Sequence, residues 1–162
     1  EFKKLLSEII KLIIPIVPEL YEEESLNYLA EFASITSFPN SNAQVWHRDS
    51  RDSNGLLFTA FVNLMEVSKD VGPLQVVRGS HKEIKLDSVV KKNDIKTLEL
   101  EPMSVVIMDS RLIHRGSSNT SKNKIRPVIY ASFGRIDLDD PGYHIRKEYQ
   151  QYGNLRISDL LN

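Results

Sequence analysis

Two side chains that can bind a metal ion, His47 and Asp49, lie two positions apart in segment 44–50. Because side chains alternate between the two faces of a β-strand, we expect both to point to the same face. His114, far along the chain, is the candidate third ligand. Two histidines and one carboxylate on one side of an octahedral metal leave the opposite side open, which is the donor set of non-haem Fe(II) oxygenases. The sequence therefore predicts a catalytic metal centre at His47, Asp49 and His114.

A further charged residue, Arg126, begins the apolar segment 126–133, at 126 − 114 = 12 residues after His114. Strand alternation puts it on one face with Val128, Tyr130 and Ser132. A guanidinium stays charged and pairs with a carboxylate through two hydrogen bonds, so Arg126 could bind the distal carboxylate of a metal-bound 2-oxo acid. A charge at the end of an edge strand is the alternative interpretation.

Four motifs follow one another in a fixed order: His47-x-Asp49, then Val71-Gly72-Pro73 leading to Gly79-Ser80-His81, then 105–109 leading to His114, then Asn119-Thr120-Ser121 before Arg126. From about Gln44 to Phe133, this order resembles the phytanoyl-CoA dioxygenase family of Fe(II)/2-oxoglutarate oxygenases. The resemblance implies iron ligation by His47, Asp49 and His114, and binding of the 2-oxoglutarate C5 carboxylate by Arg126. It also implies Fe(II) as cofactor, with 2-oxoglutarate and O2 as co-substrates.

The resemblance extends to the co-substrate pocket. It places Phe61 at a position where relatives carry an aromatic residue beside the co-substrate, with Thr59 and Asn63 as weaker candidates on the same strand face. Two positions depart from the family pattern. Arg78 replaces a proline before the Gly-Ser-His motif, and Gly116 replaces a serine that could contact the co-substrate.

The resemblance also bears on the type of reaction. Related halogenases carry a small residue where this chain has Asp49, so oxygenation is favoured, most often hydroxylation with release of succinate and CO2. For His81 it implies a structural turn rather than metal ligation, and Asp109 is interpreted as a strand-end turn. Three alternatives stay open: a cupin-like metal enzyme that does not use 2-oxoglutarate, a non-catalytic β-helix binding domain, and an incomplete piece of a larger enzyme.

The elements that must position these residues are mainly strands. An amphipathic pattern predicts a helix at 2–14, and a second short helix is expected at 23–31. Branched and aromatic runs separated by turn residues predict eight strands. These are 32–38, 44–49, 56–65, 73–78, 96–101, 104–109, 111–115 and 126–134. The pattern favours a mainly β fold, a double-stranded β-helix (jelly roll, cupin-like) with flanking N-terminal helices.

We expect one oxygenase domain over residues 1–162. Its parts are a helical segment (1–31), a β-helix core (32–135) and a polar tail (136–162) with a helix near 143–152; residues 79–95 are an irregular or helical insert. Because the sequence begins with Glu1 rather than Met, missing upstream residues are one interpretation.

Composition limits the function classes. A net charge of -1 provides no electrostatic basis for nucleic-acid binding, and the absence of cysteine excludes thiolate metal sites and disulfides. The longest apolar run, 12–17, is too short to cross a bilayer, and we expect a cytoplasmic protein. Four arginines near the metal ligands suggest an anionic small-molecule substrate, although solvated strand-end charges explain them equally well: Arg48, Arg51, Arg111 and Arg115. No feature indicates the oligomeric state.

Overall fold

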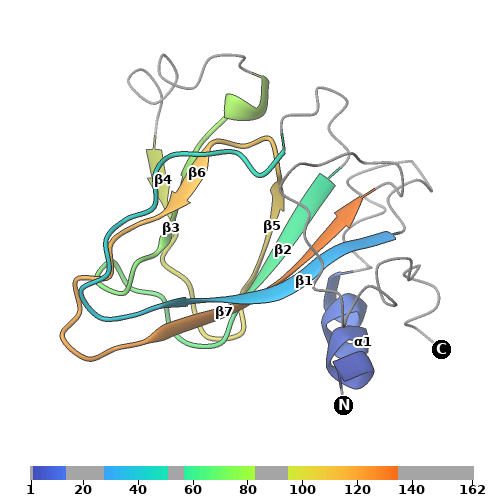
Figure 1. Ribbon diagram of the computed structural model, residues 1–162, viewed down its shortest axis with the longest axis horizontal. Coiled ribbons are helices and arrows are strands. Elements are labelled where there is room, and N and C mark those ends of the chain that lie inside the picture. The colour runs from blue at the N-terminus through green and yellow to red at the C-terminus, as the bar shows by residue number, and fades with distance from the viewer. Residues whose placement is uncertain (1, 14–27, 51–56, 83–94, 135–162) are drawn as a thin grey trace.

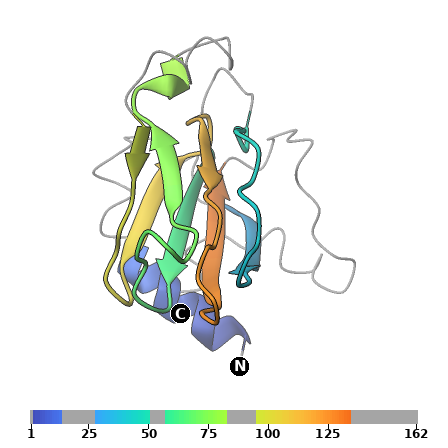
Figure 2. The ribbon, with the colours of Figure 1, turned by 90° about the vertical axis from the view of Figure 1, so that its left-hand side faces the viewer.

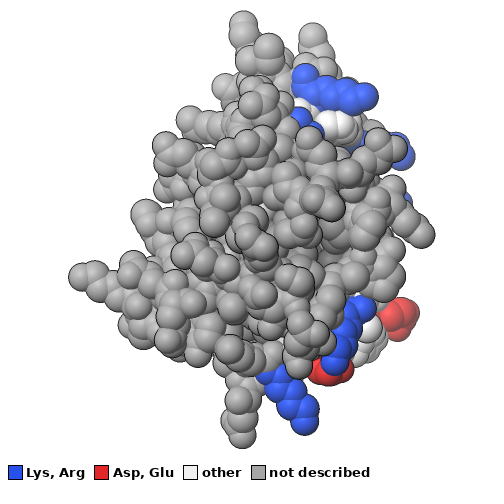
Figure 3. Space-filling model, turned by 90° about the vertical axis from the view of Figure 1, so that its right-hand side faces the viewer, with Lys and Arg blue, Asp and Glu red and all other residues white. Residues whose placement is uncertain are grey.

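The computed structural model describes residues 2–13, 28–50, 57–82 and 95–134 (Figure 1). Helix α1 (Phe2–Ile13) confirms the predicted N-terminal helix. Its side chain Ile9 is buried, whereas Lys4, Glu8 and Lys11 are exposed. Lys11 Nζ lies 3.1 Å from Glu8 Oε1, and Figure 3 shows acidic and basic side chains next to one another at the lower edge of the face that it views. In the part of the chain described, no helix has the length and apolar character needed to cross a membrane.

The larger sheet has four strands in the order β1-β7-β2-β5, and each pair of neighbours is antiparallel. Its strands are β1 (Tyr28–Ser37), β7 (Arg126–Gly134), β2 (Leu57–Asn63) and β5 (Val105–Asp109). The smaller sheet has the order β4-β3-β6 and consists of β4 (Ile95–Thr97), β3 (Leu74–Val77) and β6 (His114–Gly116). The smaller sheet lies in front of the larger one in Figure 2, so the two sheets form the two layers of a jelly roll.

The hydrophobic core lies between α1 and the outer face of the larger sheet. Its buried members are Ile9, Leu29, Ala60, Val62, Ala131 and Phe133. Removing such side chains from water contributes about 1.5–3 kcal/mol for each large one. Since side chains alternate along a strand, the residues between these core positions face the interior of the jelly roll, toward the smaller sheet. On β2 these inward residues are Thr59, Phe61 and Asn63, and on β7 they include Arg126 and Tyr130.

Two predicted elements are wrong. Residues 28–31, assigned to a second helix, are the start of β1, where pairing with β7 overrides the local helical pattern; residues 23–27 lie outside the described ranges. Segment 44–49 is not a regular strand, although His47 forms an isolated bridge with His114. Gln44 N donates a hydrogen bond to Gly116 O, and His47 N donates one to His114 O. Between these two bonds the segment advances by three residues, whereas β6 advances by only two. This extra residue interrupts the ladder, as in a β-bulge.

The other predicted strands lie within a few residues of observed ones. The strand expected at 111–115 begins only at His114, because Leu112 N donates to Asp109 O and closes a turn. Of the insert predicted at 79–95, the structure describes a short 3-10 helix, η2 (Ser80–Lys82). The helix expected near 143–152 lies outside the described residues.

Candidate metal centre

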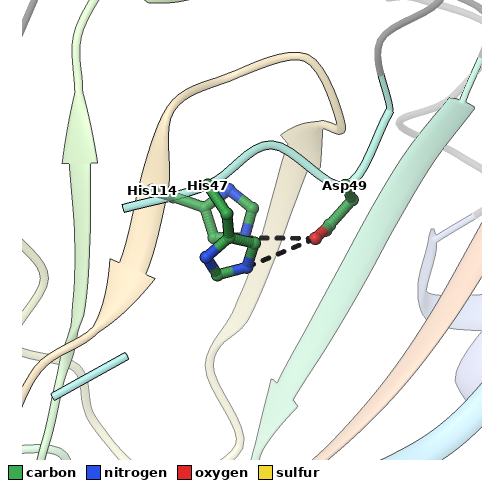
Figure 4. Close-up of side chains that lie close together, drawn as sticks. All are labelled: His47, Asp49 and His114. Carbon is green, nitrogen blue, oxygen red and sulfur yellow. Dashed lines mark ion pairs between the residues drawn. The ribbon is translucent and has the colours of Figure 1, made fainter. Parts of the chain in front are cut away.

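Three potential metal ligands from distant parts of the sequence lie together inside the jelly roll. In the described ranges, His47, Asp49 and His114 form a group whose ligand atoms all lie within 4.8 Å of one another. Asp49 Oδ1 is 3.5 Å from His47 Nε2 and 3.5 Å from His114 Nε2 (Figure 4). The ring centroids of the two histidines are 4.3 Å apart. The three atoms therefore converge on one point.

Backbone carbonyls fix which nitrogen of each histidine is available. His47 Nδ1 is 2.9 Å from Val45 O, and His114 Nδ1 is 2.9 Å from Leu112 O. A carbonyl can only accept, so each Nδ1 carries the proton and each Nε2 presents a lone pair toward Asp49. In both cases the carbonyl belongs to the residue two positions earlier. An outer partner of this kind typically orients a metal-binding histidine.

The donor set fits a metal ion. Ligand atoms in adjacent octahedral positions about 2.1 Å from a metal lie about 3 Å apart, close to the 3.5 Å seen between Oδ1 and each Nε2. Burial lowers the pKa of His114, which keeps its imidazole neutral for ligation. The Asp49 carboxylate raises the pKa of His47, because it can accept a hydrogen bond from the protonated imidazole, although burial opposes this. The side chains of His47 and Asp49 are 33% and 34% exposed, so the group is open to solvent on one side.

Backbone hydrogen bonds hold the segment that carries His47 and Asp49. The two backbone bonds between His47 and His114 are 3.0 and 2.9 Å long. The backbone amides of Asp49 and Ser50 both donate to Ser110 O, at 2.9 and 3.0 Å. The positions of both ligands therefore depend on the turn between β5 and β6, which contains Ser110. Asp109 closes this turn by accepting bonds from the backbone amide and guanidinium of Arg111, as its predicted turn role requires.

The Gly79-Ser80-His81 motif links the two ligand-bearing segments. Ser80 is fully buried; its hydroxyl accepts a 2.8 Å bond from Ile113 N, beside His114. Its carbonyl accepts a 3.0 Å bond from Arg48 Nη2, beside His47 and Asp49. His81 lies in η2, outside the group of three ligands. The motif thus connects His114 to the segment with His47 and Asp49.

Arg126 lies on the interior face of the larger sheet, at the start of β7. It is 8% exposed, and its Nε donates a 3.1 Å bond to Val71 O. Burial lowers the pKa of Arg126, but a guanidinium remains charged at neutral pH. A Cβ added at Gly116 would lie 3.9 Å from Arg126 Nη2. Gly116 and His114 share one face of β6, so the guanidinium lies beside the strand that carries a candidate metal ligand.

The Asn119-Thr120-Ser121 motif has a structural explanation. Asn119 is fully buried; its Nδ2 donates to Ser37 O and Lys124 O, and its Oδ1 accepts from the amide and hydroxyl of Ser121. These bonds fix the loop that enters β7 at Arg126. Val71 also bridges to Asn119. The motifs that contain Val71 and Asn119 therefore position the Val71 carbonyl, which Arg126 contacts.

The structure places the predicted co-substrate residues Phe61 and Thr59 on the interior face, but their surroundings differ. The hydroxyl of Thr59 is buried between Ser110 Oγ at 3.2 Å and Ser132 Oγ at 2.9 Å. Phe61 is partly buried and its ring centroid lies 5.8 Å from that of Tyr130. The hydroxyl of Thr59 therefore connects β2 to the Ser110 turn, and Phe61 is the more accessible of the two.

Sequence reasoning missed one interior pair. Tyr130 OH donates a 2.7 Å bond to Glu31 Oε1. The pKa of Tyr130 is raised mainly by burial, and further by the hydrogen bond to Glu31 and the charges of Glu31 and Asp49. Its hydroxyl therefore stays protonated at neutral pH. Alternation on β7 had already placed Tyr130 with Arg126. Glu31 could not be found because residues 28–31 were expected to be helical.

Three of the arginines near the candidate metal ligands have partners within the protein: Arg48, Arg111 and Arg115. Arg48 donates to Ser80 O, and Arg111 pairs with Asp109 at 2.6 Å. Arg115 donates to Gln75 and stacks 4.4 Å over Trp46, on the face of β6 opposite His114. There it lines a separate hollow of about 310 Å³. Arg51 lies outside the described ranges. These contacts give no support to an anionic substrate, which stays a prediction.

Comparisons with known proteins agree with this geometry. The family model described as phytanoyl-CoA dioxygenase (PhyH) matches residues 16–128, more than half of the chain. Dioxygenase easH from Epichloe festucae var. lolii is 26% identical over 106 residues, which cover 60% of this chain and 57% of that protein.

Solved structures share the fold. AviO1 from Streptomyces viridochromogenes Tue57 matches with a TM-score of 0.62 and 22% identity, over 72% of this chain and 53% of that one. SnoK, described as a non-heme alpha ketoglutarate dependent carbocyclase from nogalamycin biosynthesis, matches with a TM-score of 0.62 and 17% identity, over 79% and 58%. The predicted mainly β jelly roll is confirmed. The chain spans between about half and three fifths of the length of these three relatives.

Proposed function

Because the chain belongs to the phytanoyl-CoA dioxygenase family of Fe(II)/2-oxoglutarate oxygenases, we propose that it hydroxylates a small-molecule substrate with release of succinate and CO2. The observation that carries the proposal is the convergence of His47, Asp49 and His114 on one point, with the buried guanidinium of Arg126 beside the strand of His114. We include residues 1–162 in one oxygenase domain. Because the chain spans only part of the length of its relatives, the activity of the complete protein is also part of this proposal.

In this proposal the three ligands hold Fe(II) through His47 Nε2, His114 Nε2 and a carboxylate oxygen of Asp49. Iron and 2-oxoglutarate, when bound, supply the oxidation of a substrate C–H bond by O2. The chain's own contribution is position and electrostatics. Val45 and Leu112 carbonyls orient the imidazoles, and Arg126 binds the distal carboxylate of 2-oxoglutarate in a buried setting where a charged hydrogen bond is strong.

The roles of Phe61 and Thr59 follow from their surroundings. We assign the Phe61 ring to one wall of the co-substrate pocket. Thr59 acts through Ser110, whose carbonyl holds the amide of Asp49. Thr59 is therefore a positioning residue in this proposal rather than a direct contact of 2-oxoglutarate.

Anaerobic titration of the chain with Fe(II) and then 2-oxoglutarate tests these assignments. We expect a weak visible charge-transfer band that His114→Ala abolishes and Arg126→Ala shifts to at least about tenfold higher 2-oxoglutarate concentration. His81→Ala, outside the ligand group, and Arg78→Ala, on the surface, are the matched controls and should leave the band unchanged.

Iron binding without a band would contradict the use of 2-oxoglutarate and favour the cupin-like alternative. The choice of hydroxylation over other oxidations is tested separately by mass spectrometry under ¹⁸O₂. The product should gain one labelled oxygen atom; an unlabelled product would contradict hydroxylation.

A further inference from the structure

A carboxylate and a phenol form a pair on the interior face of the larger sheet, away from the three metal ligands. Glu31 lies on β1 and Tyr130 on β7, and the hydroxyl of Tyr130 donates to Glu31 Oε1 at 2.7 Å. Glu31 is opposite Ser132, whose hydroxyl bonds Thr59 of β2, so its side chain is on the interior face. A charge placed on an inward position of a sheet needs a partner or a ligand.

The partners of Glu31 are few. Within the described ranges, Tyr130 is the one hydrogen-bond partner of its carboxylate, and no lysine or arginine there lies within ion-pair distance. Tyr130 takes one oxygen, which leaves the other able to accept a hydrogen bond. Glu31 is partly buried rather than fully buried.

The pair lies across the interior from the segment that carries Asp49. Asp49 is held at Ser110, at the end of β5, whereas Glu31 is on β1, three strands away in the order β1-β7-β2-β5, so the two backbones are about 14 Å apart. Tyr130 is on β7, between them, and contacts the Phe61 ring. Arg126 lies on the same strand as Tyr130 but four residues earlier, about 13 Å along it. The pair is thus within a small molecule's length of the metal centre and separate from Arg126.

Resting on the proposed function, we propose that Glu31 and Tyr130 bind the prime substrate, and that this substrate presents a hydrogen-bond donor, a protonated amine or a hydroxyl group, to the Glu31 carboxylate. Glu31 accepts from the donor, Tyr130 holds the carboxylate in place, and the substrate's C–H bond extends toward the metal centre. A carboxylate or phosphate at this end would meet the charge of Glu31 and would be repelled. Charge complementarity therefore selects a neutral or cationic substrate end.

Three probes with one carbon skeleton test this selection: cyclohexylmethylamine, cyclohexylmethanol and cyclohexanecarboxylate. Each is titrated anaerobically into the chain loaded with Fe(II) and 2-oxoglutarate, and binding is measured by the change in the charge-transfer band. We expect the amine and the alcohol to bind at concentrations at least about tenfold lower than the carboxylate. Glu31→Gln keeps an oxygen for Tyr130 but removes the charge, and should weaken amine binding about tenfold while changing alcohol binding less than threefold.

Glu101→Gln is the matched control, since Glu101 is exposed in a turn before β5. It should bind all three probes as the unchanged chain does. Equal binding of the amine and the carboxylate would overturn the inference, and so would equal binding of the probes by Glu31→Gln and Glu101→Gln. In either case, a charge-transfer band with Fe(II) and 2-oxoglutarate would leave the proposed function intact. A chain that forms no band with Fe(II) and 2-oxoglutarate overturns the proposed function, and this inference with it.

Discussion

The candidate site has a metal end, formed by His47, Asp49 and His114, and an arginine end around Arg126, and the two ends are built differently. Around Arg126, buried residues are held by many hydrogen bonds: the side chain of Asn119 alone takes part in four, and Arg126 is 8% exposed. At the metal end, His47 and Asp49 are about one third exposed and lie on a segment with no regular strand. Its backbone bonds go to β6 and Ser110. One end is determined by many mutual contacts, the other by a few backbone bonds.

The difference follows from what each end has to do. A buried guanidinium is stable only where its surroundings are fixed, because an unpaired charge in a low dielectric is costly. Metal ligands need to converge but must leave positions open for a co-substrate and O2. The motifs around Arg126 are therefore mainly structural, whereas in the proposed function those at the metal end supply the metal ligands. The two ends should respond differently to substitution.

Asp49→Ala should have the largest effect, and on iron rather than on the fold. The backbone bonds of residue 49 to Ser110 do not need its carboxylate, so the structure should remain. Loss of even an outer partner of a metal ligand costs about 10–100-fold in affinity, so we expect loss of a ligand to weaken Fe(II) binding by more than about 100-fold. Isothermal titration with Fe(II) measures this, with circular dichroism to check folding. Unchanged affinity would remove Asp49 from the metal centre.

Asn119→Ala should show the opposite behaviour at the arginine end. It removes two hydrogen bonds to the buried Ser121 and one bond each to the Ser37 and Lys124 carbonyls, which should lower the free energy of unfolding by about 2–3 kcal/mol. Urea denaturation measures the loss, and Asn123→Ala, at an exposed position, is the control. Fe(II) affinity of the folded protein should stay the same; a stability equal to that of the control would contradict the structural role of the motif.

A pair of glycines, Gly72 near Asn119 and Gly79 beside Ser80, separates the cost of backbone conformation from the cost of close packing. Gly72 and Gly79 both have positive φ, +81° and +75°. A Cβ at Gly72 would lie 2.9 Å from Ser117 O and from Ser37 Oγ, whereas a Cβ at Gly79 would meet nothing within 4 Å. We expect Gly79→Ala to cost about 1 kcal/mol from conformation alone, and Gly72→Ala about 2 kcal/mol. Thermal unfolding compares them, and equal losses would refute the packing argument.

Gly116→Ala should have the smallest effect and acts where the two ends meet. Its Cβ would lie 3.1 Å from Gln44 Oε1, which accepts a 2.7 Å bond from Gly116 N, and 3.9 Å from Arg126 Nη2. The Gln44 amide can move by a few tenths of an ångström, so stability should fall by less than about 1 kcal/mol. We expect a two- to fivefold weaker apparent affinity for 2-oxoglutarate in the band titration. A tenfold or greater loss would mean that Gly116 contacts the co-substrate directly.

Local periodicity predicted the face of each regular strand but not the irregular parts. Alternation placed Phe61 and Arg126 on the interior face, because β2 and β7 pair without interruption over their length. His47 and Asp49 do converge with His114, but through an interrupted ladder rather than a strand with period two. The extra residue there depends on pairing with β6, about 70 residues away, which no local pattern encodes.

Residues whose role depends on tertiary partners also escaped prediction. Glu31 lay in a segment expected to be helical, and its pairing with β7 is what turns it inward. The role of Ser80 depends on Ile113 and Arg48, which lie 33 and 32 positions away. The motif around Ser80 was visible in the sequence, but the contacts that explain it required the fold.

Each of the two candidate histidine ligands, His47 and His114, obtains its orienting carbonyl from the residue two positions earlier in the chain. Each histidine and the backbone carbonyl two residues before it therefore form a self-contained unit. No other side chain is needed to set the tautomer of the imidazole. Neighbouring side chains can vary without turning the ring away from the metal position. Such modularity would let evolution, or an engineer, change which molecules the jelly roll accepts while the metal-binding units keep working.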